Sequence, residues 1–303
     1  MRKMSRAVRG ENYGGREING LIRAFCERYG FLERFSIGKS VAGRDIPAIR
    51  FSRGESYTLF AAAFHGSEHI TSNICLMFLE DLAAAYETGG AIEGVNVRKA
   101  LEGRGVIFVP RVNPDGCEIA ISGSIGAGKR AGEITKQCGG DFSHWNANLR
   151  GVDINHNFDA DFEAVKKAEL AAGIYAAGPS RFGGTKPESE PETAALVSLC
   201  KRENLHHVCA LHTQGEVIYW GYKEHCESRC RQMAKILAAT SGYALDVPQG
   251  TAAGGGFKDW FVSYFDRPGF TVEMGRGSNP LPIEKALEIY LKAREMLTVC
   301  AIL

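Results

Sequence analysis

The segment LFAAAFHGSEHIT, from Leu59 to Thr71, decides the fold prediction. Its six consecutive apolar residues are typical of a strand that is buried on both faces of a sheet. The apolar run stops at His65, and Glu68 follows three positions later. Ligands of α/β proteins gather at the carboxyl ends of such strands, so the pair indicates a functional site at that edge.

Other apolar runs alternate with amphipathic segments along the 303 residues. The alternation predicts one α/β domain over residues 1–303, with a mixed, largely parallel twisted sheet covered by helices on both faces. A Gly-rich stretch from about 113 to 184 shows little periodicity, and a loop of that length is expected to be either functional or wrongly assigned as a loop. Strands are predicted at 57–64, 105–110, 207–211, 216–220 and 269–274, a hairpin at 35–51 turning at Ala42-Gly43, and helices at 16–30, 71–87, 190–204, 227–240 and 283–297.

Composition excludes several classes of protein. The formal net charge of +1 argues against a nucleic-acid partner, which usually requires a strongly basic surface. No apolar run is long enough for a transmembrane helix, and the first residues lack the apolar core of a secretory signal. Nine cysteines, scattered and odd in number, are typical of a reduced, cytoplasmic protein. The sequence carries no signal for an oligomeric state.

Residues with chemical potential follow four of the predicted strands. Because the strands are expected to be largely parallel, these residues should converge at one edge of the sheet. They are His65 and Glu68 after the first strand, Arg111, Asn113 and Asp115 after the second, His212 after the third, and Glu273 in the last.

Two histidines and one carboxylate match a catalytic zinc site, which uses three protein ligands and leaves a fourth position for water. His65 and Glu68 form the close pair, and His212 supplies the distant ligand. One Zn²⁺ per chain would lower the pKa of its water toward about 7. Glu273 is then available as the general base that takes the proton and later passes it to the leaving amine.

With these residues identified, the chain resembles the zinc carboxypeptidases of the carboxypeptidase A type. The resemblance extends over nearly the whole chain in five ordered motifs: HGSE, NPDG, GVDINHNF, LHTQGE and FTVEMG. It implies a carboxypeptidase-like fold and the same ligand set and base. It also implies that Asp153 orients a ligand histidine, as a carboxylate commonly does beside a metal-bound imidazole.

The sequence departs from this family where the substrate would bind. Beside Asn155, family members that trim protein C-termini carry an arginine that clamps the terminal carboxylate, and this chain has His156. An imidazole cannot make the bidentate contact of a guanidinium. The tyrosine that covers the substrate in the family falls near Thr251. A simple digestive carboxypeptidase is therefore disfavoured.

A narrower subgroup is more similar. The segments LHTQGEVIYWGY, SEPET, GGGFKDWF and PGFTVEMGRGSNPLP resemble the γ-D-glutamyl-diaminopimelate endopeptidases of bacterial cell-wall turnover. This resemblance implies a peptidoglycan-derived peptide, a muropeptide, as substrate. We expect no separate wall-binding domain, because the catalytic motifs begin by residue 65. Small imported muropeptides are therefore the expected substrates.

Polar residues near the motifs are candidates for substrate contacts. Arg150 is the candidate for a substrate carboxylate or the developing oxyanion, where a fixed cation is most useful. Gln214 and Glu216 follow the third ligand and could meet an ammonium group. Lys258 falls near the specificity-pocket position of the family, although a surface lysine is the more ordinary interpretation.

Other functions stay open at this point. The first is a metallocarboxypeptidase or deacylase that acts on other small acidic amides. The second is a non-catalytic muropeptide sensor, against which the intact ligand set and Glu273 argue. A cysteine hydrolase is a weaker alternative, since no Cys–His motif is evident.

Overall fold

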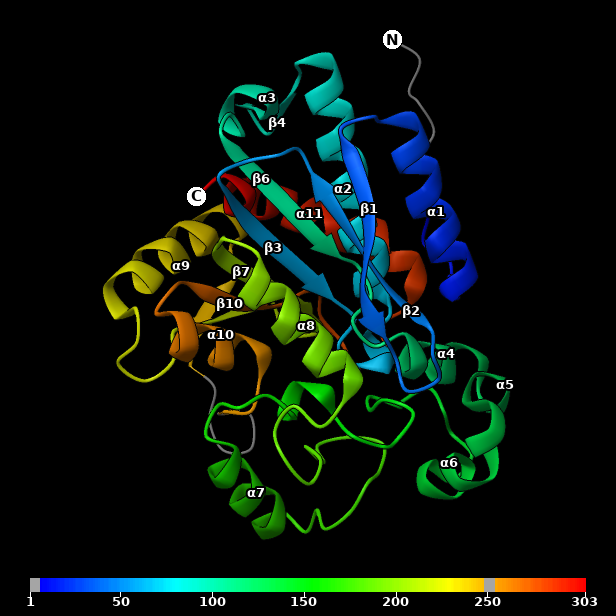
Figure 1. The fold of residues 1–303 in the computed structure, drawn as a ribbon. Helices are drawn as coiled ribbons and strands as arrows, with labels where there is room; N and C mark the ends of the chain where they lie inside the picture. The colour runs from blue at the N-terminus through cyan, green and yellow to red at the C-terminus, as the bar shows by residue number, and fades with distance from the viewer. Residues whose placement is uncertain (1–5, 248–253) are drawn as a thin grey trace.

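The computed structural model describes residues 6–247 and 254–303. Within these ranges the centre of the molecule is an eight-stranded sheet in the order β1-β2-β6-β3-β7-β10-β8-β9 (Figure 1). A separate two-stranded ribbon pairs β4 (Ala91–Ile92) with β5 (Val95–Asn96). The strands of the large sheet are β1 (Leu32–Lys39), β2 (Asp45–Phe51), β3 (Ser56–Ala62), β6 (Arg104–Val109), β7 (Leu205–His212), β8 (Val217–Trp220), β9 (Ala244–Asp246) and β10 (Gly269–Glu273).

The predicted mixed, largely parallel sheet is confirmed. The four central strands β6, β3, β7 and β10 are parallel to one another, and β8 is parallel to β9. The pairs β1/β2, β2/β6 and β10/β8 are antiparallel. The hairpin of β1 and β2 turns at the predicted Ala42-Gly43, where Gly43 adopts a φ of +78° that suits glycine.

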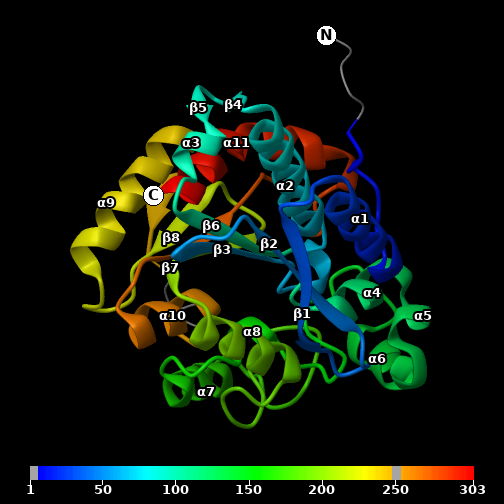
Figure 2. The same ribbon diagram turned by 45° about the horizontal axis from the view of Figure 1, so that its top comes forward.

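Helices cover both faces of the sheet (Figure 2). The long apolar helix α2 and the helices α1, α9 and α11 cover one face, and α8 and α10 cover the other. Their bounds are α1 (Gly15–Arg28), α2 (Ile70–Thr88), α8 (Pro191–Arg202), α9 (Glu227–Ser241), α10 (Phe257–Phe265) and α11 (Ala286–Ile302). No helix among the described residues is long and apolar enough to cross a membrane.

Strand β3 shows why the apolar run at its end predicted this arrangement. Successive side chains of a strand point to opposite faces. Phe60 and Ala62 therefore pack in the core under α2 and α11, while Leu59 and Ala61 pack in the core under α8 and α10. All four are fully buried, as the continuous apolar pattern requires.

The stretch from 113 to 184 is more helical than the sequence predicted. Glycines at or beside their ends keep three of its helices short, because Gly123, Gly128 and Gly139 all take positive φ values. Such short helices leave too few residues to show a periodic pattern. The helices are α4 (Pro114–Ser122), α5 (Ser124–Ala127), α6 (Ala131–Cys138) and α7 (Phe162–Ala171), with short 3-10 turns η2 (Gly128–Arg130) and η3 (Ile154–His156).

Candidate metal centre and its surroundings

Three predicted ligands meet where β3 and β7 end side by side. His65 follows β3 and precedes the 3-10 turn η1 (Gly66–Glu68), whose last residue is Glu68. His212 is the last residue of β7, the parallel neighbour of β3. A side chain at Gly66 would clash with the carbonyl oxygens of Gly116 and Trp145, so the tight turn between the first two ligands requires glycine.

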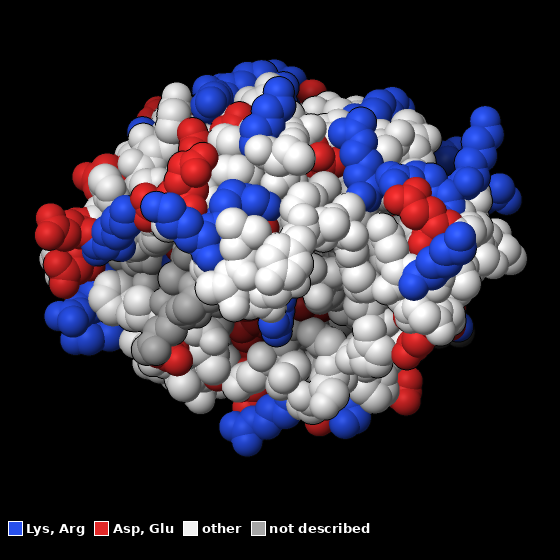
Figure 3. Space-filling model, turned by 90° about the horizontal axis from the view of Figure 1, so that it is seen from below, with Lys and Arg blue, Asp and Glu red and all other residues white. Residues whose placement is uncertain are grey.

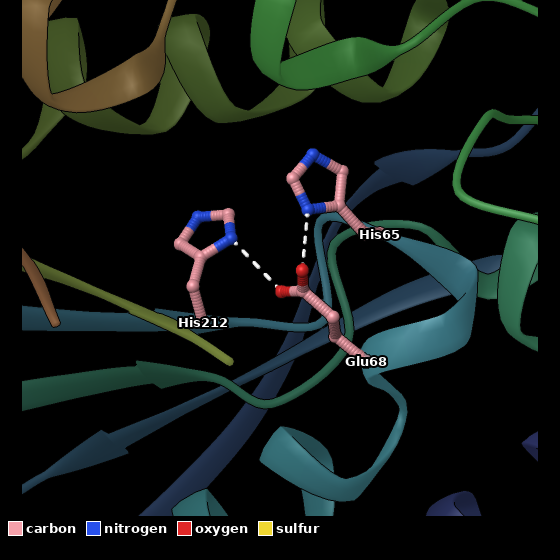
Figure 4. Close-up of side chains that lie close together, drawn as sticks. All are labelled: His65, Glu68 and His212. Carbon is pink, nitrogen blue, oxygen red and sulfur yellow. Dashed lines mark hydrogen bonds and ion pairs between the residues drawn. The ribbon is translucent and has the colours of Figure 1, made fainter. Parts of the chain in front are cut away.

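The carboxylate of Glu68 lies between the two imidazoles (Figure 4). Its Oε1 atom is 3.0 Å from Nδ1 of His65, and its Oε2 atom is 3.0 Å from Nδ1 of His212. One ligand atom from each residue lies within 4.8 Å of the others. Glu68 and His212 are buried, whereas the side chain of His65 keeps 15% of its surface exposed. The cluster is therefore open to solvent on one side.

The donor set fits a zinc ion. Nε2 of His65 lies 3.2 Å from Oδ1 of Asp153, which leaves Nδ1 to face Glu68 and a bound ion. A carboxylate on the outer nitrogen of a ligand imidazole is the usual support in zinc proteins. Two imidazole nitrogens and one carboxylate oxygen are also the ligand types that zinc prefers.

Charge in this cluster is unbalanced without a cation. Burial lowers the pKa of His65, but the charges of Glu68 and Asp153 outweigh it and raise that pKa well above the ordinary value. Burial raises the pKa of Glu68, but His65 and the hydrogen bond from His212 bring it down to about 2. The site thus favours positive charge between its carboxylates, which a divalent ion would supply.

Glu273 ends β10 and is paired in register with His212 on the parallel strand β7. Neighbouring strands lie about 4.8 Å apart, so the two side chains emerge next to each other on one face. Burial, followed by repulsion from Glu68, raises the pKa of Glu273 well above its usual range, against the opposing effect of His65. A dication at the ligands would lower that pKa again and leave a carboxylate able to accept a proton.

The segment after Asp153 borders this cluster. Backbone N–H of Asn155 donates to Oδ1 of Asp153, and Oδ1 of Asn155 accepts from the N–H of Phe257 at the start of α10. Nδ1 of His156 is buried and has no hydrogen-bond partner among the described residues. An unsatisfied buried imidazole nitrogen is a candidate for contact with a ligand.

The structure describes two of the three remaining candidates for substrate contacts. Gln214 is exposed directly after Thr213. Arg150 is about half exposed, and its Nη1 atom lies 3.4 Å from the buried carboxylate of Glu190. Thr251 lies outside the described residues.

The structure does not direct Glu216 toward an incoming ammonium group. Its buried carboxylate lies 2.6 Å from Nε of Arg276 and 2.5 Å from Nζ of Lys292, so cations of this chain already neutralise it. The surface interpretation of Lys258 is wrong. Its side chain is 3% exposed, donates to the carbonyl of Gly221 at 2.7 Å and forms an ion pair with Asp259.

The residues after β6 support the fold rather than join the ligands. Asn113 caps α4 through the N–H of Gly116 and holds the carbonyl of Phe64 at 3.0 Å, which fixes the chain before His65. Asp115 forms an ion pair with Arg44. Arg111 is buried and donates from Nε to the hydroxyl of Ser72, whereas its two Nη atoms have no hydrogen-bond partner among the described residues.

Two contacts to Glu68 were missed by the sequence analysis. The N–H of Thr213 donates to Oε2 at 3.2 Å, and Nδ2 of Asn279 donates to Oε1 at 3.2 Å. The sequence offers one signal for the second contact, the motif GRGSNPLP. Among the side chains of this motif, the amide of Asn279 can both donate and accept a hydrogen bond, and it carries neither a charge nor a hydroxyl group.

Figure 3 looks onto this end of the molecule and shows a hollow near its middle, with acidic and basic side chains inside it.

Comparison with known proteins agrees with this geometry. A family model described as zinc carboxypeptidase matches residues 18–300. The chain is 35% identical over 291 residues to γ-D-glutamyl-L-diamino acid endopeptidase 1 of Lysinibacillus sphaericus, a match that covers 95% of this chain and 72% of the relative.

Solved structures share the fold at low identity. Thrombin activatable fibrinolysis inhibitor superimposes with a TM-score of 0.73 at 19% identity, over 96% of this chain and 74% of that one. Murein-tripeptide amidase MpaA of Escherichia coli O157 gives 0.52 at 20% identity, over 87% and 91%. From the family match, the ordered motifs and the geometry of the ligand cluster together, we conclude that this chain belongs to the zinc carboxypeptidase family.

Proposed function

We propose that the protein is a zinc metallopeptidase that hydrolyses the γ-D-glutamyl–meso-diaminopimelate amide bond of peptidoglycan-derived peptides. The observation that carries this proposal is the 35% identity, over 95% of the chain, to a relative named for this class of bond. His65, Glu68 and His212 are the proposed zinc ligands, and their mutual distances are compatible with one ion.

The proposed chemistry assigns one role to each group. Zinc held by His65, Glu68 and His212 would supply a water of lowered pKa and would polarise the scissile carbonyl. Glu273 accepts a proton from the attacking water and returns it to the leaving nitrogen of the diamino acid. Asp153 keeps His65 in the tautomer and orientation that leave Nδ1 free for the metal.

A cavity with charged side chains supports a substrate whose distal end carries one positive and one negative charge. The cavity, of about 480 Å³, lies where β8 ends, between α7, α9 and α10. Its charged lining is balanced, and comprises Asp161, Glu227 and Asp259 with Lys223, Arg231 and Lys258. Asp161 pairs with Lys223, and Lys258 pairs with Asp259. We therefore propose that Glu227 and Arg231 are the charges that match the ammonium group and the carboxylate at the end of the meso-diaminopimelate side chain.

One hydrogen bond links the helix that lines the cavity to the segment that follows Asp153. Phe257, the residue before Lys258, donates its N–H to Asn155, and Asn155 lies two residues after Asp153. His156, with its unpartnered Nδ1, is the proposed contact for the α-carboxylate of the leaving diamino acid. Gln214 and Arg150 are proposed contacts on the glutamyl side, where Arg150 would meet a carboxylate.

The cysteines support a cytoplasmic location for the proposed activity. All nine are free in the structure, and most of them are buried. Free thiols in this number are typical of a reducing compartment. We therefore place the proposed activity in the turnover of muropeptides after their import.

The test is mass-spectrometric hydrolysis of L-Ala-γ-D-Glu-meso-diaminopimelate by the zinc-loaded protein. The expected result is release of free diaminopimelate by the wild type and a loss of about 10²- to 10⁴-fold in kcat for Glu273→Gln, with zinc still bound at one ion per chain. No release by zinc-loaded wild type would reject this substrate. Release from L-Ala-γ-D-Glu-L-Lys at the same rate would reject the role of the charged cavity.

A further inference from the structure

The loop that follows β10 returns to the proposed metal centre through Asn279. The side-chain amide of Asn279 donates from Nδ2 to Oε1 of Glu68 at 3.2 Å and to the backbone carbonyl of Thr213 at 2.7 Å. In return, the hydroxyl of Thr213 donates to Oδ1 of Asn279 at 2.8 Å. The half-buried side chain of Asn279 therefore binds both the ligand Glu68 and Thr213, the residue that follows the ligand His212.

Together with the backbone of Thr213, this amide fixes both oxygens of the Glu68 carboxylate. Oε1 faces His65 and receives the Asn279 amide, while Oε2 faces His212 and receives the N–H of Thr213. Figure 4 shows the carboxylate between the two imidazoles. The imidazole contacts must change when an ion enters between the ligands. The N–H donors of Thr213 and Asn279 belong to residues that are not ligands, so their hydrogen bonds to Glu68 can remain in place.

We propose that Asn279 is a positioning residue for the metal centre, holding the Glu68 carboxylate and the end of β7 in the arrangement that binds zinc. The inference rests on the metal site of the proposed function. Groups that hydrogen-bond a ligand carboxylate orient it and commonly change metal affinity about 10- to 100-fold when removed. An amide suits the position because it donates to Glu68 and Thr213 while accepting from the Thr213 hydroxyl, without adding charge beside a carboxylate.

Three substitutions separate this role from general support of the loop. Asn279→Ala removes both donors and the acceptor. Asn279→Asp keeps the shape but replaces the donor by an oxygen that repels Glu68. Thr213→Val removes only the hydroxyl that orients the amide, and keeps the N–H that Glu68 receives. Ser278→Ala changes the exposed preceding residue and is the matched control.

The experiment measures zinc dissociation constants of the purified full-length protein by competition with a chromogenic chelator. It also records the visible absorption bands of the Co²⁺-substituted protein and the melting temperature of the metal-free protein. We expect the constant to rise about 10- to 100-fold for both Asn279 variants, less for Thr213→Val, and not at all for Ser278→Ala. The Co²⁺ bands of Asn279→Ala and Asn279→Asp should shift, because the geometry of the ligands changes.

The outcomes that overturn the inference differ from those that overturn the proposed function. Unchanged zinc affinity and unchanged Co²⁺ bands in both Asn279 variants would reject the positioning role, even if the melting temperature fell. Wild-type protein that binds no zinc would reject the inference together with the metal site. Wild-type protein that binds one zinc ion but releases no diaminopimelate would reject the proposed substrate, while the affinities of the variants would still decide the role of Asn279.

Discussion

Two clusters of buried charge in this protein are neutralised in different ways. At the ends of β3 and β7, Glu68 and Asp153 flank His65, which can balance them only by taking up a proton. At the start of α10, Lys258 and Asp259 are each about 3% exposed and balance one another directly. An added cation would therefore neutralise the carboxylates of the first cluster, whereas the charges of the second cluster already neutralise each other in the folded protein. Electrostatic balance therefore distinguishes a site prepared for a metal from a structural ion pair of similar burial.

The largest expected effect comes from removing a ligand of the first cluster. Glu68→Ala deletes the carboxylate that faces both imidazoles, so we expect the protein to lose stoichiometric zinc, with an affinity change beyond the roughly 100-fold limit of outer groups. Metal content after dialysis, measured with a colorimetric chelator, tests this. Zinc fully retained by Glu68→Ala would mean that the ion binds elsewhere. Lys258→Met should keep its zinc and serves as the comparison.

The next largest effect should be on the stability of the fold rather than on zinc binding. Lys258→Met leaves Asp259 buried without its cation, which typically destabilises a protein by about 3–5 kcal/mol. The double variant Lys258→Met/Asp259→Asn should recover much of this loss, because the amide oxygen can still accept from the N–H of Gly254. Urea unfolding of the metal-free proteins measures both. If the single and double variants were equally unstable, unpaired charge would not be the cause.

The buried carboxylate of Glu192 extends the comparison to the effect of pH. Glu192 is fully buried, accepts from Asn148 and the N–H of Val41, and has its pKa raised by burial to about 7. Between its ordinary pKa of 4.5 and about 7, the folded protein holds a proton that the unfolded chain releases. Stability should therefore fall as the pH rises through this window, by up to about 3 kcal/mol above pH 7.

Glu192→Gln tests this sign directly. The variant should be more stable than the wild type at pH 8, and its advantage should vanish below pH 4.5. Unfolding free energies at several pH values provide the measurement, with the exposed Glu284→Gln as control. A wild-type protein that gained stability relative to Glu192→Gln as the pH rose would show that the carboxylate is better paired when ionised.

The same contrast explains what the sequence could predict. His65, His212 and Glu273 lie at the ends of apolar strands, and the alternation of strands with helices places such ends at one edge. The burial of Lys258 was not predictable, because a lysine is ordinarily exposed and one of its partners is the carbonyl of Gly221, remote in the chain. Backbone partners carry no signature in the sequence.

The ion pairs of Glu216 and the contacts of Asn279 were missed for a related reason. Arg276 and Asn279 lie in one loop after β10, and the conformation of that loop decides which of them meets Glu216 and which meets Glu68. Residue type alone indicates that each can form a polar contact. It does not indicate with which group, because tertiary structure selects the partner.

The smallest expected effect concerns Arg150, whose charge is only partly balanced by a buried carboxylate. Its guanidinium is half exposed and close to the buried carboxylate of Glu190, so solvent and an internal partner both weaken its hold on a substrate. We expect Arg150→Ala to raise KM about tenfold, or about 1.4 kcal/mol, with little change in kcat. Steady-state kinetics on the tripeptide, with Arg150→Lys beside it, gives the two constants. A loss of 10²-fold or more in kcat at unchanged KM would instead assign Arg150 to the developing oxyanion, since that pattern marks an interaction made only in the transition state.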